Sequence, residues 1–274
     1  MEWERAKNYL ILFLIILNVG LGLVLFSENR RYIITSEQEA LVHNVLGQNG
    51  ITFAPQASMQ RNFAPMRPLD IRGLYYDIDK LLEIFFKNET GVSQDIIFGQ
   101  QVFYANGGSM SISNGFISYE NPAGFRNGKS ATEFIRSYFP DFRQDSYFTV
   151  DDSYRIIYRQ VYSGHIIHSN FIEFLVTDQG ITRIEMQFGR VLGHTGTLDR
   201  IFSPDEALLV FLQRVRIFTR YEPMVITLMD MVYFKEYVSD QFETYQAVPF
   251  YRIFTYCRAD RPFLINAFTN IISD

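Results

Sequence analysis

An uncharged apolar stretch near the N-terminus constrains this chain more than any other feature. Tyr9 to Phe26 reads YLILFLIILNVGLGLVLF and contains no charged residue. As a helix rising about 1.5 Å per residue, it would be about 27 Å long, close to the ~30 Å hydrocarbon thickness of a bilayer. Trp3 and Tyr9 flank its inner end, where amphipathic rings favour the membrane interface. The stretch predicts a transmembrane helix over 9–27, preceded by a cytoplasmic tail over 1–8.

The same stretch has two other interpretations, a buried core helix and a cleaved signal peptide. A core helix is rarely apolar on all sides while also beginning a few residues from the N-terminus. A signal peptide has a shorter apolar region and an A-x-A-like cleavage site, and the weak candidate site Gly20-Leu21-Gly22 lies inside the apolar run. We therefore expect an uncleaved single-pass anchor in the cell membrane. Because only a short tail precedes Tyr9, the N-terminus is expected in the cytoplasm and the folded domain outside the cell.

Two residues of this segment point to a contact with another helix. Asn18 lies near its middle, and Gly22 follows one turn later on the same face. A polar side chain in hydrocarbon seeks a partner, and a small residue allows a second helix to approach closely. We expect Asn18 and Gly22 to form a helix–helix contact with a partner protein. The alternative is that Asn18 hydrogen-bonds the backbone of its own helix.

Composition limits the partners of the exported part. The chain has 274 residues and a formal net charge of −5, and the two acidic and two basic residues of the first eight cancel. An acidic domain is a poor ligand for nucleic acid, so nucleic acid is excluded as a main partner. The single Cys257 allows no internal disulfide, and its apolar surroundings predict a buried thiol.

Helix and strand signals alternate along the rest of the chain. Strands are expected near Ile96 to Tyr104 and Met110 to Tyr119, then as a meander around Tyr158, Phe174 and Met186, where apolar and polar residues alternate. Further strands follow over 225–237, 245–257 and 262–268. Helix starts with capping residues are Ser36 with Glu39, Asp77, Ser130 with Glu133, and Ser203 with Glu206.

This order predicts an α+β fold with an N-terminal transmembrane helix and two related lobes of antiparallel sheet covered by helices. The lobes are expected over 33–121 and 129–274. The stretch Asn121 to Gly128, which is rich in Pro, Gly and Asn, is expected to separate them.

The sequence contains no recognisable catalytic constellation. It lacks the H-E-x-x-H, G-x-S-x-G, P-loop and dinucleotide motifs. His165 and His168, three apart on a predicted strand, would point to opposite faces and could share a metal only across a bulge. Asp151-Asp152 is interpreted as a solvated loop. We expect no enzymatic activity, no metal and no cofactor.

Several short motifs resemble the YycI (WalI) family, which regulates the YycFG (WalRK) two-component system of Gram-positive bacteria. They are the opening MEWERAK, Leu17-Asn18 in the apolar segment, FSPDEAL over 202–208, PFYRI over 249–253 and INAFT over 265–269. The family often has Trp where Phe250 or Tyr251 stands, and Gly where Asn270 stands. The resemblance spans essentially the whole chain in length and layout.

The resemblance implies a non-enzymatic membrane regulator of the sensor histidine kinase YycG (WalK) that acts together with the sister protein YycH. Through the kinase, such a protein would tune cell-wall metabolism. One alternative is an exported binding or protease-inhibitor module of the PepSY type, which combines meanders and helices in the same way. A membrane-tethered hydrolase is a second alternative, against which the missing nucleophile–base pair counts.

Overall fold

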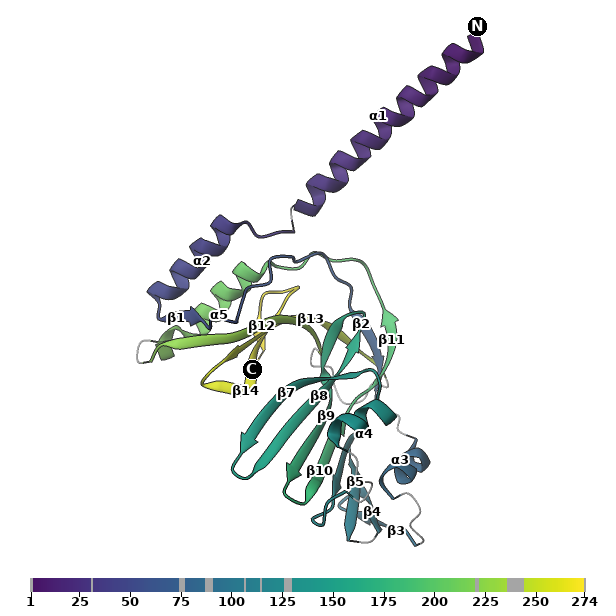
Figure 1. The fold of residues 1–274 in the computed structure, drawn as a ribbon, viewed down its shortest axis with the longest axis vertical. Helices are drawn as coiled ribbons and strands as arrows, with labels where there is room; N and C mark the ends of the chain where they lie inside the picture. Colours follow the sequence, from purple (N-terminus) through teal and green to yellow (C-terminus); the bar gives the residue numbers. More distant parts are fainter. Residues whose placement is uncertain are drawn as a thin grey trace.

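The computed structural model describes residues 2–30, 32–73, 77–86, 91–105, 107–113, 115–125, 130–219, 222–235 and 244–273. Its helices are α1 (Glu2–Arg30), α2 (Ser36–Gln48), α3 (Ile78–Phe85), α4 (Ala131–Tyr138) and α5 (Pro204–Thr219). Its strands are β1 (Ile51–Phe53), β2 (Leu69–Arg72), β3 (Ser93–Ile97), β4 (Gln100–Ala105), β5 (Gly108–Ser113), β6 (Phe116–Glu120), β7 (Phe142–Val150), β8 (Ser153–Tyr162), β9 (His165–Thr177), β10 (Gly180–Gln187), β11 (Arg190–His194), β12 (Met224–Lys235), β13 (Thr244–Thr255), β14 (Arg258–Asn266) and β15 (Ile272–Ser273). In Figure 1, α1 projects from a body made mainly of strands.

The helix starts follow the capping chemistry that the sequence predicts, with one shift. At α4, the Ser130 hydroxyl accepts from the Glu133 N–H, and the Glu133 carboxylate accepts from the Ser130 N–H at 2.9 Å. This reciprocal pair satisfies two backbone donors that the first helical turn leaves free. At α2 the cap is Thr35, one residue before the predicted Ser36, and Gln38 completes the capping box.

All fifteen strands belong to one connected sheet. Its main path runs β11-β2-β13-β12-β9-β10-β6-β5-β4-β3, and β9, β12 and β13 each have a further neighbour. A long strand can do this because separate stretches of it pair with separate partners. β9 pairs in parallel with β12 at Ile166 and Ile167. From Phe171 to Thr177 it pairs antiparallel with β10. We call β3–β10 the meander arm and β1, β2 and β11–β15 the terminal arm.

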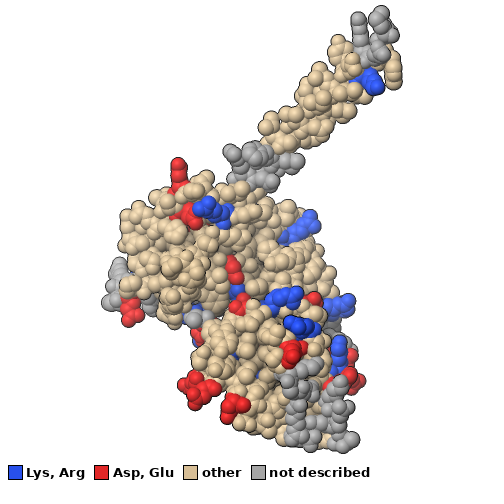
Figure 2. All heavy atoms as spheres, in the orientation of Figure 1, with Lys and Arg blue, Asp and Glu red and all other residues tan. Residues whose placement is uncertain are grey.

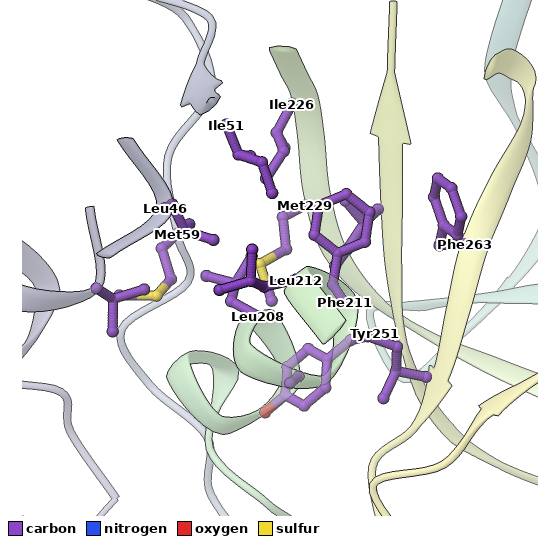
Figure 3. Close-up of a cluster of buried hydrophobic side chains, with 14 of the residues drawn as sticks. Leu46, Ile51, Met59, Leu208, Phe211, Leu212, Ile226, Met229, Tyr251 and Phe263 are labelled. Carbon is purple, nitrogen blue, oxygen red and sulfur yellow. The ribbon is translucent and has the colours of Figure 1, made fainter. Parts of the chain in front are cut away.

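Each arm buries its own hydrophobic cluster. In the meander arm, α3 and α4 cover the strands, and Phe85, Phe134 and Phe174 lie at the centre of the cluster. In the terminal arm, α2 packs on α5 and β1, and α5 packs on β14. Figure 3 shows Leu46 of α2 and Phe211 of α5 in this cluster. The terminal cluster draws on residues 34–63 and 201–267, so the meander arm is inserted between its two sequence segments.

The predicted α+β fold of two related lobes is wrong. The body is predominantly β-sheet with five helices along the described chain, and its strands form one sheet. Strand β6 lies before the predicted separation at 121–128, whereas β10 lies after it, yet the two pair from Glu120↔Arg183 to Ile117↔Met186. Residues 126–128 of that separation lie outside the described residues. Non-local pairing of this kind leaves no local signal in the sequence.

The transmembrane helix predicted over 9–27 is also corrected. Across the part of the chain that the structure describes, no helix has both the length and the apolar character needed to cross a membrane. The helix itself forms as α1, and its side chains from Tyr9 to Leu23 are exposed.

The strand predicted from Ile96 to Tyr104 is in fact a hairpin of β3 and β4. Its turn is Phe98-Gly99, between the paired residues Ile97 and Gln100. Neither φ is negative: Phe98 has φ 50° and Gly99 has φ 80°. Because Phe is not a turn-forming residue, the apolar pattern concealed this turn.

Candidate functional site

A buried arginine lies at the junction of the two arms. Arg252 comes from β13, and its side chain is only 1% exposed. Its Nε donates to Asp230 Oδ1 at 2.9 Å and its Nη2 donates to Asp230 Oδ2 at 2.6 Å. It also donates from Nη1 and Nη2 to the two carboxylate oxygens of Asp145, at 2.9 and 2.8 Å. One guanidinium thus binds two carboxylates, each through two hydrogen bonds, which is the geometry that favours arginine over lysine.

A β-bulge brings Asp145 to this arginine. In the β7–β8 ladder, Gln144 pairs with Tyr158 and Ser146 pairs with Ile157, so Asp145 is the extra residue. A bulge bends its strand and redirects the extra side chain. It allows a carboxylate of the meander arm to reach a strand of the terminal arm. The Asp145 side chain is 4% exposed at this position.

A second irregularity, in β9, completes the group. Arg159 of β8 pairs with Phe171, but the next residue pairs with Ile167, so residues 168–170 are left out of the β8–β9 ladder. Arg159 Nε donates to Asp145 Oδ2 at 2.9 Å, and its Nη1 donates to the His168 carbonyl. His168 Nδ1 lies 3.3 Å from Arg252 Nη1. We call Asp145, Arg159, His168, Asp230 and Arg252 the buried charge cluster.

The ionisation of this cluster follows from burial and mutual attraction. Burial alone would raise the pKa of Asp145, but the hydrogen bonds and charges of Arg252 and Arg159 more than offset it, and the pKa lies below its ordinary value. The pKa of His168 lies well below 6.5, mainly because the ring is buried and also because the positive charges of Arg159 and Arg252 disfavour a second charge there. His168 is therefore neutral at pH 7. Two arginines and two aspartates leave the cluster without net charge.

The contacts of the buried charge cluster are those of a structural link between the two arms. Its carboxylates are occupied by guanidinium donors. The Ser146 hydroxyl also donates to Asp145 Oδ2 at 3.0 Å, but the lowered pKa of Asp145 makes this carboxylate a weak base for activating a nucleophile. Four strands of both arms supply the four charges, so the cluster links the arms through interactions that are costly to break one partner at a time. Asp230, with its side chain 28% exposed, is the member most open to solvent.

Comparison with known proteins adds information on the fold only. No family model matches the chain, and no curated protein matches it. The chain is similar to a solved structure of an uncharacterized protein from Eubacterium rectale ATCC 33656, with a TM-score of 0.54 and 12% identity, over 80% of this chain and 88% of that one. It is also similar to the Bacillus megaterium YpeB C-terminal domain, with a TM-score of 0.41 and 12% identity, over 74% of this chain and 98% of that one. The first likeness shows a shared fold; the second is too distant to support more.

Three of the five motifs that resemble the YycI family, FSPDEAL, PFYRI and INAFT, come together in the terminal arm. The Phe202 N–H donates to the Ala267 carbonyl at 2.8 Å, and the Ala267 N–H donates to the Pro249 carbonyl at 2.8 Å. The Tyr251 hydroxyl donates to the Phe202 carbonyl at 2.7 Å. Three motifs that are far apart in sequence therefore form one hydrogen-bonded unit. The residue types of these motifs are therefore explained by their contribution to the fold.

The site residues predicted on the N-terminal helix lie away from the buried charge cluster. Trp3 and Tyr9 are exposed on α1, and an added Cβ at Gly22 would meet nothing within 4 Å. Asn18 Nδ2 donates to the Leu14 carbonyl at 2.8 Å, which is the alternative considered from the sequence. A contact with a partner helix involves a second chain and stays a prediction.

The structure does not bring together the two histidines considered as a metal pair, and it places Cys257 on the surface. His165 contacts the Tyr233 ring, whereas His168 lies in the buried charge cluster, and no group of metal-ligating side chains occurs among the described residues. Cys257 is exposed in the turn after β13, so the predicted buried thiol is wrong.

The sequence analysis missed the buried charge cluster. One signal was available, because Arg252 is the single charged residue in the mainly apolar stretch AVPFYRIFT over 247–255, and the structure buries all nine of these residues. A charged residue in such a run needs a partner of opposite charge.

Proposed function

We propose that this protein is a non-enzymatic regulator that acts by binding other proteins. The observation that carries the proposal is the closed state of its buried charge cluster, in which the charged groups are bound to one another. A polar group that acts on a substrate needs free capacity for it. This cluster instead holds the two arms together.

The resemblance to the YycI family supports the choice of partners. In this proposal the protein binds the sensor histidine kinase YycG (WalK) together with a YycH-like sister protein, and so tunes two-component control of cell-wall metabolism. The body lies at the outer face of the cell membrane, as the resemblance implies. Helix α1 carries exposed apolar side chains along its described length, and exposed apolar surface of this extent is typical of an interaction site. Figure 2 shows charged residues scattered over the visible face of the body and few along the described part of α1.

The proposal makes a thermodynamic demand on the contact. A regulator shifts a kinase between two states only through its different affinity for each state. A difference of about 1.4 kcal/mol changes the ratio of the states tenfold. One or two well-placed contacts can supply that difference.

A reconstitution of the kinase tests the proposal. YycG in membrane vesicles is assayed for autophosphorylation alone, with the full-length chain, and with the chain and the YycH-like protein together. We expect the full-length chain to copurify with the kinase and to change the amount of phosphorylated kinase severalfold. An unchanged kinase and no copurification would reject the proposal. An unrelated histidine kinase in the same vesicles is the control for nonspecific effects.

A second candidate function is an exported binding or protease-inhibitor module of the PepSY type. It is favoured by a repeated order of elements: α4 is followed by the antiparallel strands β7, β8 and β9, and α5 by β12, β13 and β14. Stoichiometric inhibition of a secreted protease by the purified chain, with no effect on the kinase, would favour this function over the first.

A further inference from the structure

The turn of the β3–β4 hairpin carries a phenylalanine, Phe98, whose side chain is not buried in the body. Phe98 is fully exposed, with a relative exposure of 101%, and its neighbour Ile96 is 68% exposed. Ile97 is also exposed. Together Ile96, Ile97 and Phe98 form an apolar tip, which we call the Phe98 tip. Burial does not explain the residue types at this end of the hairpin.

Backbone conformation does not explain Phe98 either. Its φ of 50° lies in the left-handed region, where the Cβ of an L-residue crowds the following carbonyl. Two-residue hairpin turns with positive φ at both positions favour Asn-Gly or Asp-Gly. Phe98-Gly99 keeps the glycine but replaces the favoured first residue by a large aromatic one. A side chain that is both exposed and conformationally disfavoured points to a role outside the folded body.

Strand addition at the neighbouring edge is not that role. β3 is the last strand on the main path of the sheet, but the Asp95 carboxylate accepts from the Ile96 N–H at 2.8 Å. This backbone donor is therefore not free to pair with an added strand. A second copy of β3 aligned antiparallel on Asp95 would also place two aspartates opposite each other, which is unfavourable. The tip of the hairpin, rather than its edge, is the available surface.

The charge of the region limits what the tip can contact. From Gly91 to Phe125 the sequence contains no Lys or Arg, and its only acidic residues are Asp95 and Glu120. Binding to anionic lipid headgroups depends on basic residues near the surface. An apolar tip beside a carboxylate is instead complementary to an apolar pocket with a neutral or basic rim on a protein.

We infer that the Phe98 tip is a docking knob whose aromatic ring inserts into an apolar pocket of a partner protein, with Asp95 facing the rim of that pocket. An aromatic anchor in a pocket is the usual centre of a protein interface. The inference extends the proposed function, because it places the contact on the body, but it does not require that the partner be the kinase or the YycH-like protein.

Photo-crosslinking in cells that make the protein tests the inference. Benzoylphenylalanine replaces Phe98 in the full chain, and the control places it at Val150, an exposed apolar residue at the end of the β7–β8 hairpin. We expect an adduct with one protein from position 98 and none with that protein from position 150. That protein is then purified, and its affinity is measured for the full chain and for Phe98→Asn, whose residue tolerates a positive φ. We expect Phe98→Asn to weaken binding at least tenfold and to leave thermal unfolding unchanged or at a higher temperature.

Several outcomes would overturn the inference. They are adducts with lipid alone, adducts only with a second copy of the chain, no adduct, or equal affinity of the wild type and Phe98→Asn. Sedimentation of the full chain equally well with phosphatidylglycerol and phosphatidylcholine vesicles, lost in Phe98→Asn, would assign the tip to a membrane instead. An adduct with a protein unrelated to YycG or YycH, followed by the affinity loss, would support the docking knob while counting against the proposed function.

Discussion

Asp230 and Arg252 lie directly opposite each other on β12 and β13, and two hydrogen bonds of 2.9 and 2.6 Å join the carboxylate to the guanidinium. This pair belongs to the terminal arm alone. Asp145, which reaches the same guanidinium from β7, belongs to the meander arm. Arg252 therefore joins the two arms through its side chain, in addition to the backbone pairing of β9 with β12.

Removing this guanidinium is expected to destabilise the protein strongly. Arg252→Met leaves Asp145 with Arg159 alone and Asp230 without its partner, and breaking a buried ion pair in this way costs about 3–5 kcal/mol. Urea unfolding of the full chain, followed by circular dichroism, measures the change. The matched control is Arg155→Met, which removes a more exposed pair with Glu173 and is expected to cost at most about 1 kcal/mol. Similar losses in the two variants would show that Arg252 does not join the arms.

Stability is expected to fall as the pH drops below 6.5 because of His168. Its pKa in the folded protein lies well below 6.5, so the unfolded chain takes up a proton at a higher pH than the folded chain does. Lowering the pH stabilises the state that binds more protons, which here is the unfolded state, so the free energy of unfolding decreases as the pH falls.

The variant His168→Gln should lessen this fall in the free energy of unfolding, measured by urea titrations at pH 7.5 and pH 5. Part of the fall should remain, because burial also lowers the pKa of His165. The control is His43→Gln on the exposed face of α2. A pH dependence identical in the wild type and His168→Gln would contradict the assigned cause.

Asn270→Gly is expected to stabilise the protein. Asn270 has φ 56°, a conformation that glycine adopts without steric cost, and its buried Oδ1 has no hydrogen-bond partner in the described chain. The gain is expected to reach about 1 kcal/mol, since the added freedom of glycine in the unfolded chain offsets part of it. The family that the sequence resembles often has Gly at this position. A lower thermal midpoint in Asn270→Gly would show that the Asn side chain contributes a contact.

Asn18→Leu is expected to weaken recovery of the partner proteins. Asn18 uses one N–H for the Leu14 carbonyl, and an amide has a second N–H and an oxygen to offer another helix. Loss of one such hydrogen bond, worth about 0.5–1.5 kcal/mol, corresponds to roughly a threefold to tenfold drop in copurified partner. Ile16→Leu, on the opposite side of α1, serves as the control. Equal recovery with both variants would argue against this contact.

Local signals in the sequence predicted the elements better than their assembly. The cap at Ser130 and the meander strands β8, β9 and β10 are confirmed, because capping and alternation are local properties. The pairing of β6 with β10 joins residues far apart in sequence. The irregular ladders at Asp145 and His168 lie between consecutive strands, but the partner that both side chains reach, Arg252, is distant in sequence, and no local pattern encodes that contact. Phe98 was missed for the opposite reason, since its residue type predicts a strand while its backbone forms a turn.

The insertion of the meander arm between the two segments of the terminal arm has a consequence for synthesis. β1 pairs in parallel with β12, with Ile51 beside Met224. At about 5–20 residues per second, a ribosome needs roughly 10–35 s to add the residues between them. For that time α2 and β1 have emerged without the surface they will cover. The segment of the body that is made first is thus among the last to be shielded.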